Sequence, residues 1–383
     1  MPILQPKTKS RMKNVLVALE FYRGPLFEGI AEYAREHHWH LSLDMLPNPG
    51  NIPWGWNGDG ILTMLVRDDT PLLKFLAQCD KPTVNVEGRR LGTPYPRVYT
   101  DTRQAVELAF HHLHGRGFTR FGFYGYENST RKVEFLKLLE EKGLPCAILD
   151  ESNNSWEAET RRVKAWLKSQ QSPLAVFCWT DYAGARFMDM ALSLGYKIPD
   201  EIAVIGMDNE TLVCDCTAVR LSSVRTDLHR VGYLGAAQLD RLMAGKKPSA
   251  ADQLIPPHEV VERGSTDTLA VGSPLVAKAV DYMKKPGAKM NVAAVAQACG
   301  VSRRGLEKAF RAHLGCSPHG ALVRVRISRA KALLRLPEGK IGAVGAQVGV
   351  RDPKHFTSLF KTATGISPRE YRRQWLEKNA AHS

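Results

Sequence analysis

The first two-thirds of the chain alternates short apolar runs with longer amphipathic stretches. Runs rich in β-branched residues, such as NVLVALE from position 14 and IAVIGMD from position 202, predict buried strands. Stretches such as LFEGIAEYAREHH and TRQAVELAFHHLHGRG carry apolar residues at helical spacing. Strands that alternate with helices favour parallel sheets covered by helices, and about 250 residues are long for one sheet. The pattern therefore predicts two similar α/β lobes, with a cleft between them, over residues 14–266.

The C-terminal part follows a helical pattern that occurs twice. In the first copy, Asn291 can cap a short helix that Gly300 ends in the left-handed conformation, and Ser302 can cap a second helix. The second copy repeats the apolar positions 49 to 50 residues later, and its Pro353 fits a first helical position. Two helices joined by a tight turn, the second with a cationic outer face, are typical of a helix-turn-helix motif. The sequence predicts an all-α domain with two such motifs.

The spacing of apolar residues also predicts which side of each helix is buried. Leu306 and Phe310 in the first copy, and Phe356 and Phe360 in the second, are expected to face inward. Residues 320–336 between the copies predict one amphipathic helix, roughly 25 Å long at 1.5 Å per residue. Its expected inward residues include Leu322, Val325, Ala332 and Leu333. Such a spacer can hold two reading helices near successive major grooves, which lie about 34 Å apart.

The charge is distributed unevenly along the chain. The net charge is +14, yet residues 1–272 carry 32 Lys and Arg against 33 Asp and Glu, whereas residues 273–383 carry 21 against 6. A compact unit with such a basic excess is typical of a protein that binds a polyanion, because neutralised phosphates release condensed counterions. We expect a basic tail at 1–13, a sensor domain at 14–266, a linker at 267–274 and a DNA-binding domain at 275–383.

Several classes of protein are disfavoured. No run approaches the roughly 18 apolar residues of a membrane span, and the polar start lacks a secretory apolar stretch, which favours a cytoplasmic protein without a membrane partner. We find no G-x-G-x-x-G after a strand, no G-x-x-x-x-G-K-[ST], no G-x-S-x-G and no H-E-x-x-H. Cys214 and Cys216 are the only close cysteine pair, a weak metal signal. We expect no enzyme, no cofactor and no metal.

The basic segment resembles the AraC-family DNA-binding domain. The resemblance is carried by VAAVAQACGVSRRGLEKAFRAHLGCSP and by GAVGAQVGVRDPKHFTSLFKTATGISPREYRR. By position, it implies base-edge contacts from Arg304, Glu307, Lys308, Lys354, His355, Thr357 and Ser358. Arginine and lysine can donate to guanine, and glutamate can accept from cytosine. The remaining cationic residues are expected to hold phosphates, the alternative for any one of them being a solvated helix face: Arg303, Arg311, Lys361, Arg372 and Arg373.

Polar and aromatic residues follow the predicted strands of the first part. Ligands of open α/β sheets bind at the carboxyl ends of strands, so these residues are expected to line a cleft for a polyhydroxylated ligand. The predicted ligand-binding residues are Phe21, Tyr22, Arg23, Asp101, Thr180, Asp181, Asp208 and Asn209. The stretches 126–131 and 225–227 occupy similar positions, and Trp179 is a further aromatic residue there. Asp101 and Asp181 also precede helical runs, where a capping role is the alternative.

The same region resembles the periplasmic-binding-protein-like sensor of the LacI family. EGIAEYAREH, YTDTRQAVELAFHHLHGRGFTRFGFYG, IPDEIAVIGMDNE and LSSVRTDLHRVGYLGAAQLDRLMAG carry this resemblance. A LacI-type sensor ahead of an AraC-type domain is the order of the XylR-type group of xylose-responsive transcription regulators, which the whole chain resembles. The resemblance implies a small sugar effector, namely a pentose such as D-xylose, together with a double-stranded DNA operator and a homodimer. It also implies RNA polymerase as a partner if the protein is an activator.

Two alternatives stay open. The stretch GYENSTRKVEFLKLLEE lacks the tryptophan expected in that loop of the group, which leaves room for a different sugar. The other alternative is a sugar-binding or enzymatic α/β protein whose basic tail attaches it to DNA without sequence preference.

Overall fold

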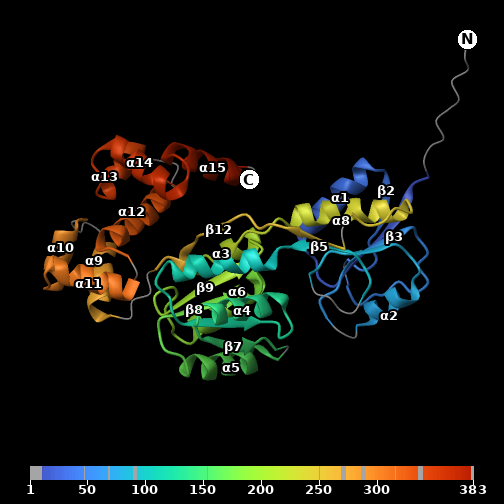
Figure 1. Cartoon of the computed structure of the whole chain (residues 1–383), viewed down its shortest axis with the longest axis horizontal. Helices are drawn as coiled ribbons and strands as arrows, with labels where there is room; N and C mark the ends of the chain where they lie inside the picture. The colour runs from blue at the N-terminus through green and yellow to red at the C-terminus, as the bar shows by residue number, and fades with distance from the viewer. Residues whose placement is uncertain are drawn as a thin grey trace, which may run out of the picture. The chain divides into compact units, whose positions relative to one another are not determined.

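The computed structural model describes residues 11–46, 48–67, 70–88, 93–152, 154–249, 251–268, 273–285, 290–314, 316–334 and 340–380. Most of the expected basic tail and positions 269–272 of the expected linker lie outside these residues. The chain divides into two compact units, one of residues 1–113 and 120–266, and the other of residues 114–119 and 267–383 (Figure 1). No helix among the described residues is both long enough and apolar enough to cross a membrane.

The first lobe of the first unit is built on a parallel six-stranded sheet in the order β11-β5-β4-β3-β1-β2. Its strands are β1 (Lys13–Leu19), β2 (Trp39–Ser42), β3 (Gly60–Met64), β4 (Thr83–Asn85), β5 (Arg97–Thr100) and β11 (Asp252–Ile255). Helices α1 (Gly24–Glu36) and α8 (Leu228–Met243) cover one face, and α2 (Pro71–Gln78) covers the other. Alternate residues of β1 accordingly enter different cores, Val17 beneath α1 and α8 and Leu16 beneath α2.

The second lobe repeats this plan with a sheet in the order β12-β10-β9-β8-β6-β7. Its strands are β6 (Phe121–Gly125), β7 (Cys146–Asp150), β8 (Leu174–Cys178), β9 (Ile202–Met207), β10 (Ser222–Val224) and β12 (Val260–Val261). All described pairings are parallel except that of β10 with β12. Its helices are α3 (Thr102–His114), α4 (Thr130–Glu141), α5 (Trp156–Lys168), α6 (Asp181–Ser193) and α7 (Thr211–Cys216), with a short helix η1 (Gly264–Thr266). The prediction of two α/β lobes is confirmed.

Three segments connect the lobes: β5 to α3, β10 to α8, and β11 to β12. Backbone hydrogen bonds tie these segments together. The Asp101 amide donates to the Ile255 carbonyl at 2.8 Å, and the Arg225 amide donates to the Glu259 carbonyl at 2.8 Å. A few connecting residues that can absorb backbone rotation are the usual form of a hinge between two lobes.

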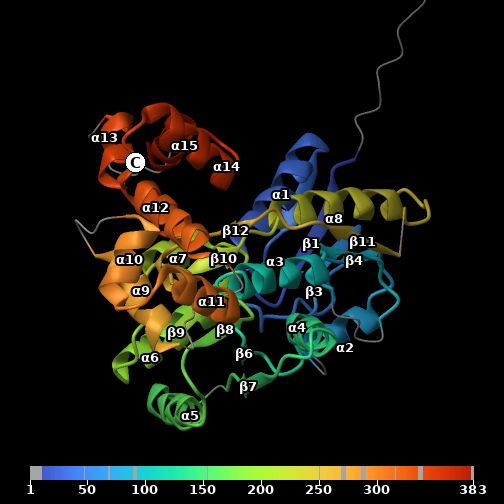
Figure 2. The ribbon, with the colours of Figure 1, turned by 60° about the vertical axis from the view of Figure 1, so that its left-hand side comes forward.

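The second unit is all-helical. It contains α9 (Pro274–Lys284), α10 (Val292–Cys299), α11 (Arg303–Leu314), α12 (Pro318–Leu334), α13 (Ile341–Gln347), α14 (Pro353–Thr364) and α15 (Pro368–Ala380). Figures 1 and 2 both show α12 running from the group of α9, α10 and α11 to the group of α13, α14 and α15. One apolar core lies among α9 to α12, and a second lies among α12, α13 and α14.

The expected helix ends are confirmed in both copies of the helical repeat. The Asn291 side chain accepts from the Ala294 amide at 2.8 Å, and Gly300 ends α10 with a φ of 73°. Ser302 caps α11, and Asp352 caps α14 directly before Pro353. The inward prediction for Leu306, Phe310, Phe356 and Phe360 is also confirmed, because each is at most 1% exposed.

The expected inward face of the connecting helix is partly wrong. Leu322 and Val325 are buried as expected, but Ala332 is exposed and Leu333 is only half-buried. The physical reason is that α12 serves two cores. Its first half buries Leu322 and Val325 against α9 to α11, whereas its second half buries Ile327 and Leu334, with Ala330, against α13 and α14. The buried stripe therefore changes side along the helix, and a single periodicity cannot describe it.

Candidate functional sites

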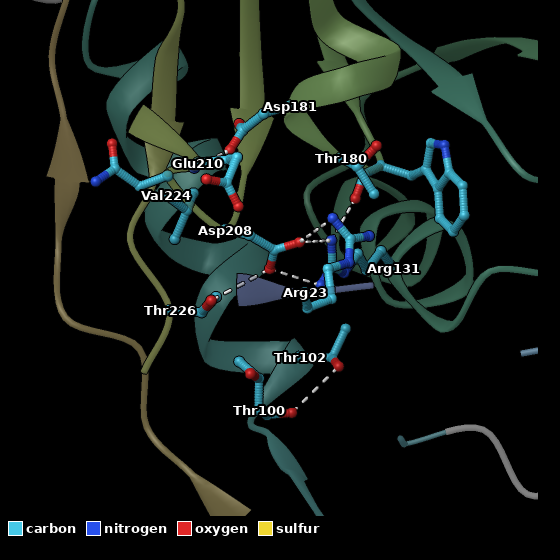
Figure 3. Close-up of polar contacts among 12 residues, drawn as sticks. Arg23, Thr100, Thr102, Arg131, Thr180, Asp181, Asp208, Glu210, Val224 and Thr226 are labelled. Atoms are coloured by element: carbon cyan, nitrogen blue, oxygen red, sulfur yellow. Dashed lines mark hydrogen bonds and ion pairs between the residues drawn. The ribbon is translucent and has the colours of Figure 1, made fainter. Parts of the chain in front are cut away.

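Asp208 lies directly after β9 at the floor of the cleft and forms the centre of a charged cluster (Figure 3). Its Oδ1 atom accepts from Arg131 Nη2 at 2.8 Å, and its Oδ2 atom accepts from Arg131 Nη1 at 3.0 Å. Thr226 Oγ1 donates to the same carboxylate at 3.2 Å. Arg23, which follows β1 in the first lobe, places Nη1 at 3.8 Å from Oδ2. Asp208 of the second lobe thus lies within ion-pair distance of Arg23 of the first lobe.

The electrostatics of this cluster keep Asp208 ionised. Burial by itself raises the pKa of a carboxyl group, but the charges of Arg131 and Arg23 outweigh it, and the pKa of Asp208 is lowered. The carboxylate is only 4% exposed. Its backbone φ of 101°, followed by 55° at Asn209, is unusual for residues other than glycine. Strained backbone of this kind is common where a side chain must point into a binding site.

Asp181 and Thr180 support the floor from the start of α6. Thr180 Oγ1 accepts from the Ala183 amide at 3.2 Å, and Asp181 Oδ2 accepts from the Glu210 amide at 2.7 Å. Burial, together with the negative charge of Asp208, raises the pKa of Asp181 to about 7. Asp181 is 1% exposed, so solvent does not reach it. Its hydrogen bond with the Glu210 amide holds the turn between β9 and α7.

The cleft is a large cavity with a small extension at its floor. The larger part, which we call the outer chamber, has a volume of about 730 Å³. It is lined by Phe21, Tyr22, Arg23, Val66, Arg67, Tyr126, Glu151, Trp179, Thr180, Tyr182, Ala183 and Arg186. The extension, which we call the inner pocket, has about 50 Å³ and reaches Asp208, Arg131 and Glu87. Both lobes contribute residues to both parts.

Five of the eight predicted ligand-binding residues line the outer chamber or the inner pocket: Phe21, Tyr22, Arg23, Thr180 and Asp208. The other three lie outside both linings. Asp101 caps α3 by accepting from the Gln104 amide at 3.0 Å, and Asp181 is buried as described above. The backbone amide of Asn209 donates to Ser223 Oγ at 3.0 Å.

Several cleft residues were not among the predicted ligand-binding residues. Arg131 belongs to the stretch 126–131 that follows β6, and Glu151 directly follows β7, so their positions after strands were a usable signal. Arg186 lies inside α6, where nothing in the sequence marks it. Glu151 accepts from Arg186 Nη1 at 3.0 Å and from Trp179 Nε1 at 3.1 Å.

The predicted DNA-binding residues of the first helix-turn-helix motif lie on α11. Arg303, Arg304, Lys308 and Arg311 are exposed, and Glu307 is half-buried. Glu307 also lies 3.4 Å from Arg303, measured between Oε1 and Nε. The helix therefore presents a basic outer face opposite its buried Leu306 and Phe310.

The second motif presents its predicted residues on α14 and α15. Lys354, His355, Thr357, Ser358 and Lys361 are all exposed on α14. The Thr357 hydroxyl donates to the Pro353 carbonyl at 2.8 Å, so its oxygen can still accept a hydrogen bond and its methyl group can make an apolar contact.

The two arginines on α15 differ. Arg372 is half-buried, and its Nε donates to the Leu334 carbonyl at the end of α12 at 3.2 Å. Arg373 has a side chain that is 65% exposed. Arg373 is therefore the more accessible of the two to a phosphate.

The cysteines of the pair Cys214 and Cys216 differ in burial. Cys214 is buried and Cys216 is exposed, and the described residues contain no group of three or more metal-ligating side chains.

Residues 110–266 match the model of a periplasmic binding protein-like domain. Residues 295–374 match that of a helix-turn-helix domain. The fold and its two sites define a DNA-binding transcription regulator with a periplasmic-binding-protein-like sugar sensor.

Two xylose operon regulatory proteins are similar to the chain over most of its length. The chain is 30% identical to the xylose operon regulatory protein of Escherichia coli strain K12, over 95% of this chain and 97% of that one. It is 29% identical to the xylose operon regulatory protein of Haemophilus influenzae, over 82% and 84% of the two chains. A solved structure of a xylose-binding transcription activator, xylR, matches with a TM-score of 0.61 at 27% identity, over 95% and 98%. The chain belongs to the XylR-like family of sugar-sensing regulators with an AraC-type DNA-binding domain, which are not enzymes.

Proposed function

We propose that the protein activates genes for pentose utilisation in response to D-xylose. The observation that carries the proposal is the cluster of Asp208, Arg131 and Arg23 at the floor of the cleft, in a chain whose relatives regulate a xylose operon. A carboxylate accepts hydrogen bonds from hydroxyl groups, and a guanidinium group donates to them in a fixed planar geometry. Paired hydroxyls of a pentose satisfy both groups at once.

Sugar binding acts by drawing the two lobes together. Asp208 belongs to the second lobe and Arg23 to the first, so a sugar that bonds to both favours the closed form. The three connecting segments then rotate as a hinge. A ligand shifts a conformational equilibrium only by its preference for one form, so the response requires contacts that exist in the closed form alone.

The regulated output is binding to operator DNA in the cytoplasm. In a homodimer, closure repositions two DNA-binding domains so that they engage paired half-sites, and activation proceeds through contact with RNA polymerase. On α11 and α14, the base contacts come from Arg304, Glu307, Lys308, Lys354, His355, Thr357 and Ser358, and phosphate contacts come from the remaining predicted cations. Asp101, Asp181 and Asn209 lie outside both cavity linings and act indirectly, Asp101 at the hinge and the other two at the cleft floor.

Calorimetry with the full chain tests the proposal. D-xylose is titrated beside L-arabinose, D-ribose and D-glucose, and thermal unfolding is followed in parallel, because a ligand that binds only the folded state raises its stability. We expect D-xylose to bind most tightly of these four monosaccharides. Tighter binding of a hexose would contradict the proposed effector and favour the alternative sugar that the stretch 125–141 leaves open.

A further inference from the structure

The outer chamber is too large for one pentose ring. Its volume of about 730 Å³ lies in the upper part of the range of about 300–1,000 Å³ in which proteins hold drug-sized ligands. The inner pocket, at about 50 Å³, has room for little more than one water molecule of about 30 Å³. A sugar that bonds to Asp208 therefore places its ring in the chamber, with space left beside it.

Aromatic rings from both lobes border this remaining space. Tyr22 and Tyr182 are 58% and 56% exposed, although both line the chamber. Arg23, whose Cζ lies 6.0 Å from the Tyr182 ring centroid, connects Tyr182 to the cluster at the floor. Large aromatic side chains that stay exposed inside a cavity are typical of a binding surface, because a ligand that covers them removes apolar area from water.

Trp179 is held in place as a fixed wall of the same chamber. Its Nε1 atom donates to Glu151 at 3.1 Å, and its ring lies 5.8 Å from that of Tyr126, centroid to centroid. A side chain at Gly125 would collide with the indole, so the glycine of β6 leaves the space in which the ring lies. A ring fixed by a hydrogen bond and by packing is preorganised, and it loses little entropy when a ligand stacks on it.

The polar groups at the edge of the chamber are planar and can form hydrogen bonds with the hydroxyl groups of a sugar. Arg186 is held by Glu151 at 3.0 Å, and Arg67 places its Cζ 5.0 Å from the Phe21 ring centroid. Flat rings with planar polar groups at their edges match a sugar ring, which has an apolar C–H face and a rim of hydroxyls. The chamber therefore offers such surfaces on both lobes.

We propose that the outer chamber is a subsite for a second sugar ring, so that the preferred effector is a pentose disaccharide whose terminal ring contacts Asp208. This inference rests on the proposed function, because it assigns the larger ligand to the same cleft. The second ring stacks between Tyr182 and Trp179 and exchanges hydrogen bonds with Arg186 and Glu151. Closure over two rings buries more apolar area than closure over one.

Calorimetry with three probes tests the inference: D-xylose, xylobiose and D-xylulose 5-phosphate. We expect xylobiose to bind about tenfold more tightly than D-xylose, a difference of about 1.4 kcal/mol. Equal or weaker binding of xylobiose would overturn the inference and leave the proposed function standing. Tightest binding of the phosphorylated sugar would overturn it too, since the arginines would then recognise an anion. Failure of all three probes would overturn the proposed function as well.

A matched pair of variants locates the second ring. Tyr182→Ala removes an exposed aromatic ring from the chamber, and Trp156→Ala removes one that is 49% exposed at the start of α5 and does not line the chamber. We expect Tyr182→Ala to reduce the ratio of xylobiose to D-xylose affinity about tenfold, and Trp156→Ala to leave that ratio unchanged. An equal ratio in both variants would show that Tyr182 does not contact a second ring and would overturn the assignment.

Discussion

The cleft and the DNA-binding helices both gather charged side chains, but they hold them in opposite ways. In the cleft, Asp208 is 4% exposed and bonded to Arg131. On α11 and α14, Arg304 and Lys354 are exposed above helices whose apolar sides form the core. The paired charges in the cleft therefore contribute to the stability of the fold, whereas the exposed charges on the helices contribute little to it.

The largest difference between the two regions is expected in stability. Asp208→Ala leaves the Arg131 guanidinium without its buried partner, which costs about 3–5 kcal/mol of unfolding free energy. It also removes the sugar response. Urea unfolding measures the first effect and calorimetry the second. Glu134→Ala is the control, because its ion pairs with Lys137 at 3.3 Å and with Arg103 at 3.9 Å are more exposed, and each is worth less than about 1 kcal/mol. Equal losses in the two variants would contradict the account of the cleft floor.

A second difference concerns pH. The pKa of Asp181 is 3.8 in an unperturbed chain and about 7 in the folded protein, so the folded state binds a proton that the unfolded state has released. Stability from this group is therefore present at low pH and is lost as the pH rises towards about 7, by at most about 1.4 kcal/mol per pH unit.

Asp181→Asn isolates this pH dependence, since the amide can still accept from the Glu210 backbone. We expect the unfolding free energy of the native protein to fall relative to that of the variant between about pH 4 and 7, and the difference to level off above that range. If the unfolding free energies of the two proteins, measured with urea at several pH values, change in parallel, the pKa of Asp181 is not raised.

Substitutions of exposed residues on α11 and α14 should change the selectivity for DNA sequence and leave the unfolding free energy unaltered. Arg304→Ala is expected to relax the preference for one base pair by about 1–3 kcal/mol. Competition binding against a set of single-base operator variants measures this change, and urea unfolding checks that stability is retained. An equal loss of affinity on specific and random DNA would count against a base contact by Arg304.

The smallest effect is expected for Arg373→Ala, which removes an exposed cation of α15. It should weaken binding to all sequences alike and reduce the slope of log affinity against log salt by about one. A titration of DNA binding at several salt concentrations provides the slope. Loss of selectivity without a change in slope would show that Arg373 contacts a base.

The two regions also differ in how far the sequence predicts them. The helical repeat is encoded locally, because Asn291, Gly300, Ser302 and Asp352 each cap or end a helix within a few residues of their own position. Caps and apolar spacing therefore predict both motifs and their buried faces. The exception is Ala332, because α12 crosses from one core to the other, and this depends on contacts far along the chain.

The cleft depends on contacts between distant segments. Arg131 and Asp208 are 77 residues apart, and Arg23 belongs to the other lobe. Position after a strand places single residues near the cleft, yet it cannot show which of them meet. Asp101 illustrates this limit, since it follows β5 as expected but caps α3 outside the cavity linings. Arg186 shows the reverse, because it reaches the chamber from inside a helix.

The measurement that tests the link between the two regions most directly is a pair of binding titrations on the full chain. Affinity for a DNA site selected by the protein is measured with and without saturating sugar, and affinity for the sugar is measured with and without that DNA. Linkage requires both affinities to change by the same factor, and the account predicts an increase of about 5- to 150-fold. A sugar that binds in the cleft while the affinity for DNA stays unchanged would contradict it.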